Sequence, residues 1–326
     1  MGSTGVVHLV WGPLGTAPLR RFARSYREHP AGAAHELVVL LNGVRSAQRA
    51  ELLAELHGID HRVVEVPEPI QDLAAYAHTL GVLEHERLCF LNSHSELLAA
   101  GWLAKLERAL DQRDAGLVGA TGSWASAHSV AMHSLFLPSG YRGVFPPKRV
   151  LRAQFREIEL ERDDVVAPAD ARPSEWSALR TLQTMLRMCA VMPAQLLRFE
   201  RFPAHHLRTN AFMAERELLR SLQFGRVARK LDAYLLENGR HSLTRQVQRR
   251  GLRVLVADRD GAVYDQEQWP LSRTLWQRDQ EGLMVTDNQT RSYAHGDMER
   301  RRLLSAFAWG RQADPRPPRT SEHRPG

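Results

Sequence analysis

The stretch RLCFLNSHSELLAAGWLAKL, residues 87–106, places a polar segment between an apolar run and a helical repeat. Leu88 to Leu91 is short and apolar, as in a buried strand, and the second half carries apolar side chains at helical spacing. Asn92, His94 and Glu96 lie between the two, spaced by two residues. If the strand continues through them, alternation places all three on one face. They would then lie at the carboxyl end of the strand, where open α/β sheets bind ligands.

The same residues also suit a turn. Asn-Ser-His-Ser is good turn chemistry, and Ser95 could cap the following helix without any ligand being present. On a single strand face, the amide of Asn92, the imidazole of His94 and the carboxylate of Glu96 could instead meet a metal ion or a diphosphate. The triplet alone favours the turn, so the elements around it bear on the choice.

The composition indicates a soluble protein with affinity for anions. The chain has 326 residues, of which 43% are hydrophobic and 25% charged, enough for one large domain or two closely joined ones. A formal charge of +7 suits partners that carry phosphates, such as nucleotides, nucleic acids or anionic membrane surfaces. Two cysteines, no secretory leader and no membrane-spanning run predict a cytoplasmic protein in a reducing compartment.

Strand and helix patterns alternate regularly from residue 6 to residue 120. Apolar, β-branched runs alternate with segments of helical period, and such βα units predict a parallel sheet. The expected strands are 6–11, 36–43, 62–66, 87–91 and 116–120, and the expected helices are 19–26, 47–56, 72–80 and 98–106.

The pattern is irregular from residue 121 to about 175, where only 149–161 looks helical. Such an insertion is often a binding loop or lid, although it can be a variable excursion. Order returns with a possible helix at 176–188, a loop that enters a strand over 202–213, helices at 215–222, 230–237 and 242–250, and a strand at 252–257.

The expected boundary of the main domain lies near residue 260. A C-terminal extension over 261–310 contains a basic amphipathic helix at 297–309 that could lie on a membrane, pair with a partner or pack on its own domain. Residues 311–326 are rich in Pro and Arg, which predicts a disordered tail.

Taken in order, residues 6–260 resemble the family 2 type of nucleotide-sugar glycosyltransferase with the GT-A fold. Four segments carry the resemblance: 36–43, 72–96, 206–216, and 234–239 with the helix, glycine and strand that follow it. They resemble, respectively, the family's second strand, the helix and strand before its Asp-x-Asp signature, the strand on the acceptor side, and the segment with the catalytic base. The resemblance implies a mostly parallel sheet flanked by helices, with the insertion and the extension added.

The chain departs from the family at the signature, where Asn92-Ser93-His94 replaces Asp-x-Asp. In the family the two carboxylates hold Mg²⁺ or Mn²⁺ against the sugar diphosphate, and such hard ions prefer carboxylate oxygen. Either His94 and Glu96 form an altered metal site, or cationic groups and helix amino termini neutralise the diphosphate. The nearest candidates for that second role are His205, His206 and Arg208, although any single histidine can equally be a packing or surface residue.

The resemblance also implies an inverting displacement with Glu237 as the base that takes a proton from the acceptor hydroxyl. The donor would be a nucleotide-diphosphate sugar and the acceptor a saccharide or a lipid-linked group, with possible peripheral contact at the inner membrane face and no nucleic acid. Glu237 could also be an ordinary surface residue beside a turn. The remaining candidates are Asn42, Asp72, Asn92 and His94 for the donor nucleotide, and Trp124 and Asn210 for the diphosphate or acceptor side.

Several alternatives stay open at this point. Asn42 could serve only a turn, and Trp124 could be a buried anchor. A dehydrogenase or methyltransferase is disfavoured because no Gly-x-Gly-x-x-Gly turn is present, and no nucleic-acid-binding module is recognisable. A GT-A-like domain without its metal carboxylates could also be an inactive binding or scaffold protein in polysaccharide assembly.

Overall fold

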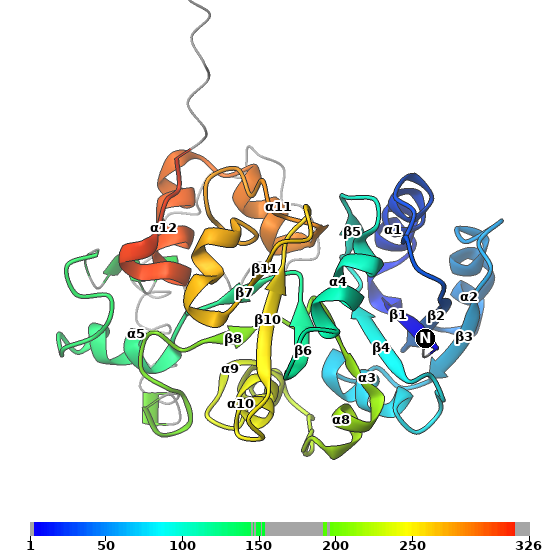
Figure 1. The fold of residues 1–326 in the computed structure, drawn as a ribbon, viewed down its shortest axis with the longest axis horizontal. Coiled ribbons are helices and arrows are strands. Elements are labelled where there is room, and N and C mark those ends of the chain that lie inside the picture. The colour runs from blue at the N-terminus through cyan, green and yellow to red at the C-terminus, as the bar shows by residue number, and fades with distance from the viewer. Residues whose placement is uncertain are drawn as a thin grey trace, which may run out of the picture.

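An eight-stranded sheet forms the centre of the molecule (Figure 1). The computed structural model describes residues 3–144, 146, 148–150, 152–153, 192–193 and 196–316. The strand order is β3-β2-β1-β4-β9-β6-β10-β11. The strands are β1 Thr4–Trp11, β2 Glu36–Asn42, β3 Arg62–Val66, β4 Arg87–Leu91, β6 Ala115–Gly119, β9 Ala211–Glu215, β10 Arg253–Ala257 and β11 Val263–Tyr264.

Most of this sheet is parallel. Strands β1 to β4 pair in parallel, as do β6 and β10, whereas β9 runs antiparallel between β4 and β6 and β11 runs antiparallel beside β10. The continuous apolar run of β2 is buried from Leu37 to Asn42, as expected for a strand covered on both faces. The predicted α/β class with a mostly parallel, helix-flanked sheet is confirmed.

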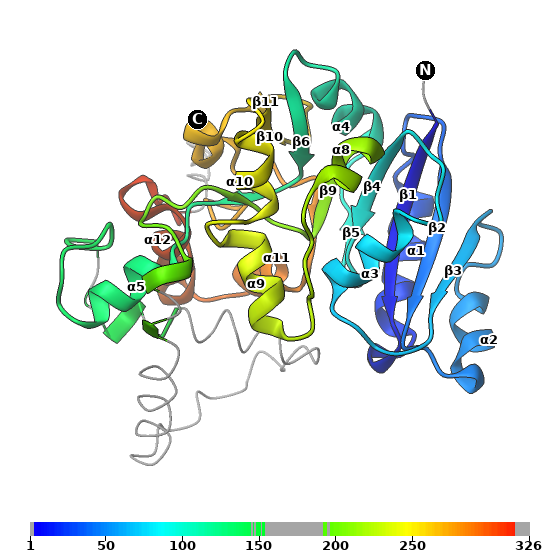
Figure 2. The same ribbon diagram turned by 90° about the horizontal axis from the view of Figure 1, so that it is seen from below.

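Helices cover both faces of the sheet (Figures 1 and 2). One hydrophobic core includes residues of α1, α2 and α4, and the other includes residues of α3, α8, α9 and α10, together with α11 and α12. The helices are α1 Ala17–Glu28, α2 Ser46–Ala54, α3 Asp72–Thr79, α4 Trp102–Leu110, α5 Ala127–Ser134, α8 Arg216–Ser221, α9 Lys230–Asn238, α10 Leu243–Gln248, α11 Asn288–Ala294 and α12 Met298–Trp309.

The segment after residue 260 is joined to the sheet and to the carboxyl edge of its parallel strands. The expected boundary falls in the turn between β10 and β11, which form one antiparallel pair. Further on, β12 Val285–Thr286 pairs with β5 Glu96–Leu97, which begins at the last residue of the polar triplet. A second ribbon pairs β7 Gly122–Ser123 with β8 His206–Leu207. Residues far apart in the sequence therefore meet at this edge.

The basic C-terminal helix packs on its own chain. Every residue of α12 from Leu303 to Trp309 is buried, and Arg301 lies over the Tyr293 ring at 4.8 Å. Within the part of the chain that the structure describes, no helix has both the length and the apolar character needed to cross a membrane. Of the expected disordered tail, residues 311–316 adjoin the domain through a Gln277 to Gln312 hydrogen bond, and 317–326 lie outside the described residues.

Two local predictions were wrong. The helix expected at 98–106 begins only at Trp102, because β5 and a turn at Gly101 with φ +69° precede it. The insertion contains a helix, α5, that its composition did not indicate; the Ser126 hydroxyl caps it by accepting a hydrogen bond from the Ser129 N–H. The helices expected at 149–161 and 176–188 lie mostly or wholly outside the described residues.

Candidate functional site

Residues Asn92 to Ser95 form a turn at the end of β4. The Asn92 Oδ1 atom accepts hydrogen bonds from the His94 N–H and the Ser95 hydroxyl, both at 3.0 Å, and the Ser95 N–H donates to the Asn92 carbonyl. The strand does not continue through these residues, so the expectation of one shared strand face was wrong. The turn alternative is confirmed, although Ser95 binds this turn and caps no helix.

A second loop, Arg208-Thr209-Asn210, lies against this turn just before β9. The Asn210 carbonyl accepts from the Asn92 N–H at 2.9 Å and from the Ser95 hydroxyl at 3.2 Å, while its Oδ1 accepts from the Thr121 hydroxyl at 2.7 Å. The buried Nδ2 atom of Asn210 has no hydrogen-bond partner among the described residues. Asn210 thus ties the ends of β4 and β6 to the start of β9.

Glu237 reaches the same loop from the last turn of α9. Its Oε1 atom accepts hydrogen bonds from the Thr209 N–H at 2.9 Å and the Thr209 hydroxyl at 3.3 Å. Because Thr209 precedes Asn210, one short path of contacts joins Asn92 to Glu237. The structure therefore brings the turn and the expected base together, although their chemical roles stay predictions.

Tyr76 of α3 lies close enough to be influenced by the charges of two acidic candidates, Asp72 and Glu237. Its hydroxyl is buried and has no hydrogen-bond partner among the described residues. Burial raises the pKa of Tyr76 well above its ordinary value, and the charges of Asp72, Cys89 and Glu237 raise it further. Its apolar helical neighbours gave Tyr76 the sequence signature of a core residue, so this polar group was missed.

Asn42, expected near the donor nucleoside, holds a neighbouring loop. Its Nδ2 atom donates to the Ile70 carbonyl at 2.7 Å, and its Oδ1 atom accepts from the Ile70 N–H at 3.0 Å. The side chain is buried at the end of β2. It therefore fixes the segment that leads into α3 and Asp72, which corresponds to the turn alternative.

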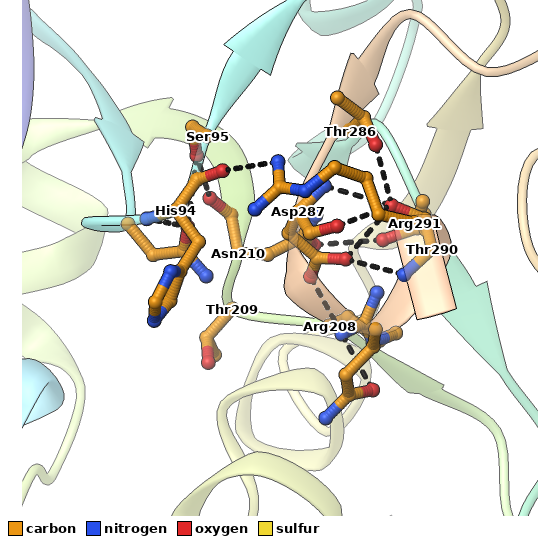
Figure 3. A network of polar contacts seen from close by, with 12 residues as sticks. His94, Ser95, Arg208, Thr209, Asn210, Thr286, Asp287, Thr290 and Arg291 are labelled. Atoms are coloured by element: carbon orange, nitrogen blue, oxygen red, sulfur yellow. Dashed lines mark hydrogen bonds and ion pairs between the residues drawn. The ribbon is translucent and has the colours of Figure 1, made fainter. Parts of the chain in front are cut away.

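Arg208, expected to neutralise a diphosphate, lies in a buried ion pair (Figure 3). Its Nη2 atom is 2.8 Å from Asp287 and donates to Gln289 at 2.7 Å. Burial alone would raise the pKa of Asp287, but Arg208 and a hydrogen bond from Thr290 bring it below its usual range. Asp287 also caps α11. Arg208 therefore links the 208–210 loop to the C-terminal segment.

The two histidines proposed beside Arg208 are poor cations. Burial, assisted by nearby arginines, lowers the pKa of both His205 and His206 to about 4. At neutral pH both rings are uncharged. His206 Nδ1 bonds to the Ala204 carbonyl at 2.8 Å, and the His205 ring contacts Trp124 edge to face at 5.2 Å.

Trp124 is anchored among other aromatic side chains. Its Nε1 donates to the Gln266 carbonyl at 2.9 Å, and its ring meets Trp309 at 5.7 Å. The ring is half-buried and packs against a hydrophobic core. This arrangement corresponds to the anchoring alternative for Trp124.

Glu96 binds arginines. Arg21 Nε and Arg291 Nη1 both donate to its Oε1 atom, at 3.0 and 2.7 Å, and Arg24 lies 4.0 Å from Oε2. Arg291 Nη1 also donates to the His94 carbonyl at 3.1 Å, while the His94 ring points away from Arg291 (Figure 3). Arg21, Arg24 and Arg291 were not among the residues expected from the sequence.

The donor set at this edge does not fit a hard divalent cation. The Asn92 Oδ1 atom already accepts two hydrogen bonds, and the Glu96 Oε1 atom is held by two guanidinium groups. Within the described ranges, no three His, Cys, Asp or Glu side chains are grouped to hold a metal ion. The altered metal site expected from His94 and Glu96 is thus not supported by the arrangement of their neighbours.

A recess lies beside the turn, between the end of β1 and the start of α1. It is lined by His8, Trp11, Gly15, Pro18 and Ser93 among others, and the Ser93 hydroxyl accepts from the Trp11 N–H. The His8 ring stacks on Phe22 at 3.7 Å, and neither ring nitrogen has a partner among the described residues. Burial, assisted by His94, lowers the pKa of His8 to about 3, so the ring is neutral. A larger cavity of about 410 Å³, between α10 and β10, is lined by none of the expected site residues.

Neither a family model nor a curated protein sequence matches the chain. Solved structures that it resembles include a mannosyltransferase from Pyrobaculum calidifontis in complex with GDP-Man and Mn²⁺, at 18% identity and a TM-score of 0.29, over 37% of this chain and 35% of that one. Glucosyl-3-phosphoglycerate synthase from Mycobacterium tuberculosis, in complex with Mn²⁺, UDP and glucosyl-3-phosphoglycerate, matches at 19% identity and a TM-score of 0.36, over 72% and 64%. TarS from S. aureus matches at 11% identity and a TM-score of 0.29, over 36% of this chain and 34% of that one.

The chain spans between about a third and just under two thirds of the length of these solved proteins. Such identities and TM-scores assign this chain to no family. Its α/β class follows from its own sheet.

Proposed function

We propose that this chain is a nucleotide-sugar glycosyltransferase of the inverting, family 2-like type, acting on a saccharide or lipid-linked acceptor. One observation carries the proposal: Glu237 and the Asn92-Ser93-His94 turn are joined by Thr209 and Asn210 at the carboxyl edge of a mostly parallel sheet. Ligands of such sheets bind at this edge. A carboxylate beside the donor position is what direct displacement requires.

In this mechanism Glu237 takes the proton from the acceptor hydroxyl. The hydroxyl oxygen then forms a bond to the anomeric carbon while the bond from that carbon to the diphosphate breaks on the opposite face. Thr209 fixes the direction of the carboxylate through its two hydrogen bonds. In this proposal Asp72 and His94 serve the donor nucleotide.

The test is Glu237→Gln with a panel of UDP, GDP and dTDP sugars, each assayed with metal omitted and restored. Transfer should fall by about 10²- to 10⁴-fold, because the amide cannot take the proton. Nucleotide binding, measured by calorimetry, should stay unchanged because the side-chain shape is kept. Glu217→Gln on the exposed surface of α8 is the matched control.

Normal turnover by the Glu237→Gln variant would remove the assignment of the base. If the unaltered protein binds nucleotides but transfers no sugar from the panel, the binding or scaffold alternative, which the absence of the Asp-x-Asp carboxylates favours, replaces the enzyme. Absence of any nucleotide binding would overturn the proposal as a whole.

A further inference from the structure

A cluster of three arginines surrounds one carboxylate beside the 92–95 turn. Arg21 and Arg24 come from α1 and Arg291 comes from α11, and all three lie within 4.0 Å of Glu96 on β5. In Figure 1, β5 lies between α1 and α11. Arg24 also lies 4.0 Å from Glu28, so these three arginines face two carboxylates and one positive charge is left uncompensated.

These cations have hydrogen-bond donors to spare. Both hydrogen bonds of Arg291 use Nη1, and Arg21 binds Glu96 only through Nε, among the residues that the structure describes. The arginine side chains are 33%, 66% and 21% exposed for Arg21, Arg24 and Arg291, so a ligand can reach them. Burial lowers the pKa of Arg291, although the neighbouring carboxylates of Glu96 and Asp287 raise it.

The 92–95 turn also presents a hydrogen-bond donor. The Asn92 oxygen is occupied by the His94 N–H and the Ser95 hydroxyl, so its amide nitrogen is the side-chain atom left to meet a ligand. Arg291 is fixed to the turn through the His94 carbonyl. Donors therefore converge where the family resemblance would place acceptors for a metal ion.

We propose that Arg21, Arg291 and the Asn92 amide bind the diphosphate of the donor directly, so that donor binding requires no divalent cation. The inference rests on the proposed function, since it concerns the same site. Guanidinium groups suit this role because their planar N–H pairs match phosphate oxygens and their charge does not depend on pH. A divalent ion placed here would meet the uncompensated positive charge of this cluster.

A purely structural role would give a different charge balance. Arg208 and Asp287 form such a structural pair, one cation to one anion, with 9% and 1% of their side chains exposed. The three arginines of the cluster at Glu96 face two carboxylates, Glu96 and Glu28, and the cluster is open to solvent. An excess of exposed positive charge is the property expected of an anion-binding site.

Glu96→Gln gives the most informative test. Nucleotide binding should be kept or tightened if Glu96 only offsets arginine charge, and lost if Glu96 is a metal ligand. UDP and GDP binding is measured by calorimetry in EDTA and again with Mn²⁺. If Glu96 only offsets part of the arginine charge, its neutralisation leaves UDP and GDP binding in EDTA unchanged or tighter. If Glu96 is a metal ligand, binding needs Mn²⁺ and the variant loses it, which would overturn the inference.

Arg291→Gln should weaken UDP or GDP binding about tenfold or more in EDTA, since a charge-assisted contact is removed. The loss should be smaller for UMP and GMP, and Arg291→Lys should restore part of it. The matched control is Arg20→Gln. Arg20 also lies on α1 but pairs with Glu55, and this variant should bind nucleotide as the unaltered protein does.

Thermal melting of each variant separates loss of binding from loss of folding. Should Arg291→Gln unfold, Glu96→Gln still decides, because it predicts retained or tighter binding. Equal affinity of folded Arg291→Gln and the unaltered protein would overturn the inference while the proposed function stands. Absence of nucleotide binding with and without Mn²⁺ would overturn both, whereas Mn²⁺-dependent binding overturns only the inference.

Discussion

Two arginine sites flank the 92–95 turn and differ in burial and in charge balance. Arg208 is almost fully buried and is matched by the single carboxylate of Asp287, which in turn caps α11. Arg21, Arg24 and Arg291 face two carboxylates, Glu96 and Glu28, and remain partly exposed. A buried charge without a partner is strongly unfavourable, so the first site has to be balanced. The second can hold excess charge because water reaches it.

This difference distinguishes an arginine whose charge is balanced within the fold from arginines that a ligand could reach. From the sequence, Arg208 was a candidate, with His205 and His206, to neutralise a diphosphate. In the structure its side chain is held by Asp287 and Gln289. The cations with donors left over come instead from the first helix and from the C-terminal extension.

Breaking the buried pair is expected to have the largest effect on stability. Asp287→Asn keeps the helix cap but leaves the Arg208 charge uncompensated, and should lower the free energy of unfolding by about 3–5 kcal/mol. Urea denaturation followed by circular dichroism measures it. Adding Arg208→Met should recover a large part of the loss, because the buried charge is then gone. A mild effect of the single variant would place this pair in the same class as the exposed cluster.

Acid should have an intermediate effect, through His8 and not through the buried pair. Asp287 has a depressed pKa, so its contribution persists until the pH falls below its ordinary range. His8 has a pKa of about 3 when folded but its ordinary 6.5 when unfolded, so stability is lost as the pH falls from 6.5 toward 3.

His8→Leu should therefore remove about 2 kcal/mol of the stability difference between pH 7 and pH 5. It should also stabilise the protein at pH 7, because two buried ring nitrogens without partners among the described residues are removed. Urea denaturation of both proteins at the two pH values is the measurement. An unchanged pH dependence would show that His8 gains a proton in the folded state.

The smallest effect is expected at an exposed pair on the same helix as the cluster. Arg20 and Glu55 form short hydrogen bonds, but the Arg20 side chain is 65% exposed, and solvent screens such pairs. Arg20→Gln should leave the melting temperature nearly unchanged. A marked decrease would mean that α1 is held mainly by its surface charges, and would weaken its use as a control for Arg291.

Local pattern predicted the first half of the fold because each βα unit there is written in consecutive residues. The runs at Val6 and at Leu37 to Leu41 are continuous and apolar, and both became buried parallel strands. The same reasoning missed α5 and misplaced the start of α4. Their limits depend on a cap at Ser126 and on the pairing of β5 with β12, which sequence period does not reveal.

The residue types and short-range period of the sequence determined the α/β class and the polar turn after β4, whereas Glu237 follows from the family resemblance. Only the tertiary structure brought the arginines of α1 and α11 to Glu96. Arg291 lies 197 residues from His94 in the chain, yet donates to its carbonyl. The physical reason is that the charge balance of an ion cluster depends on which segments meet in space, and sequence spacing does not record such meetings.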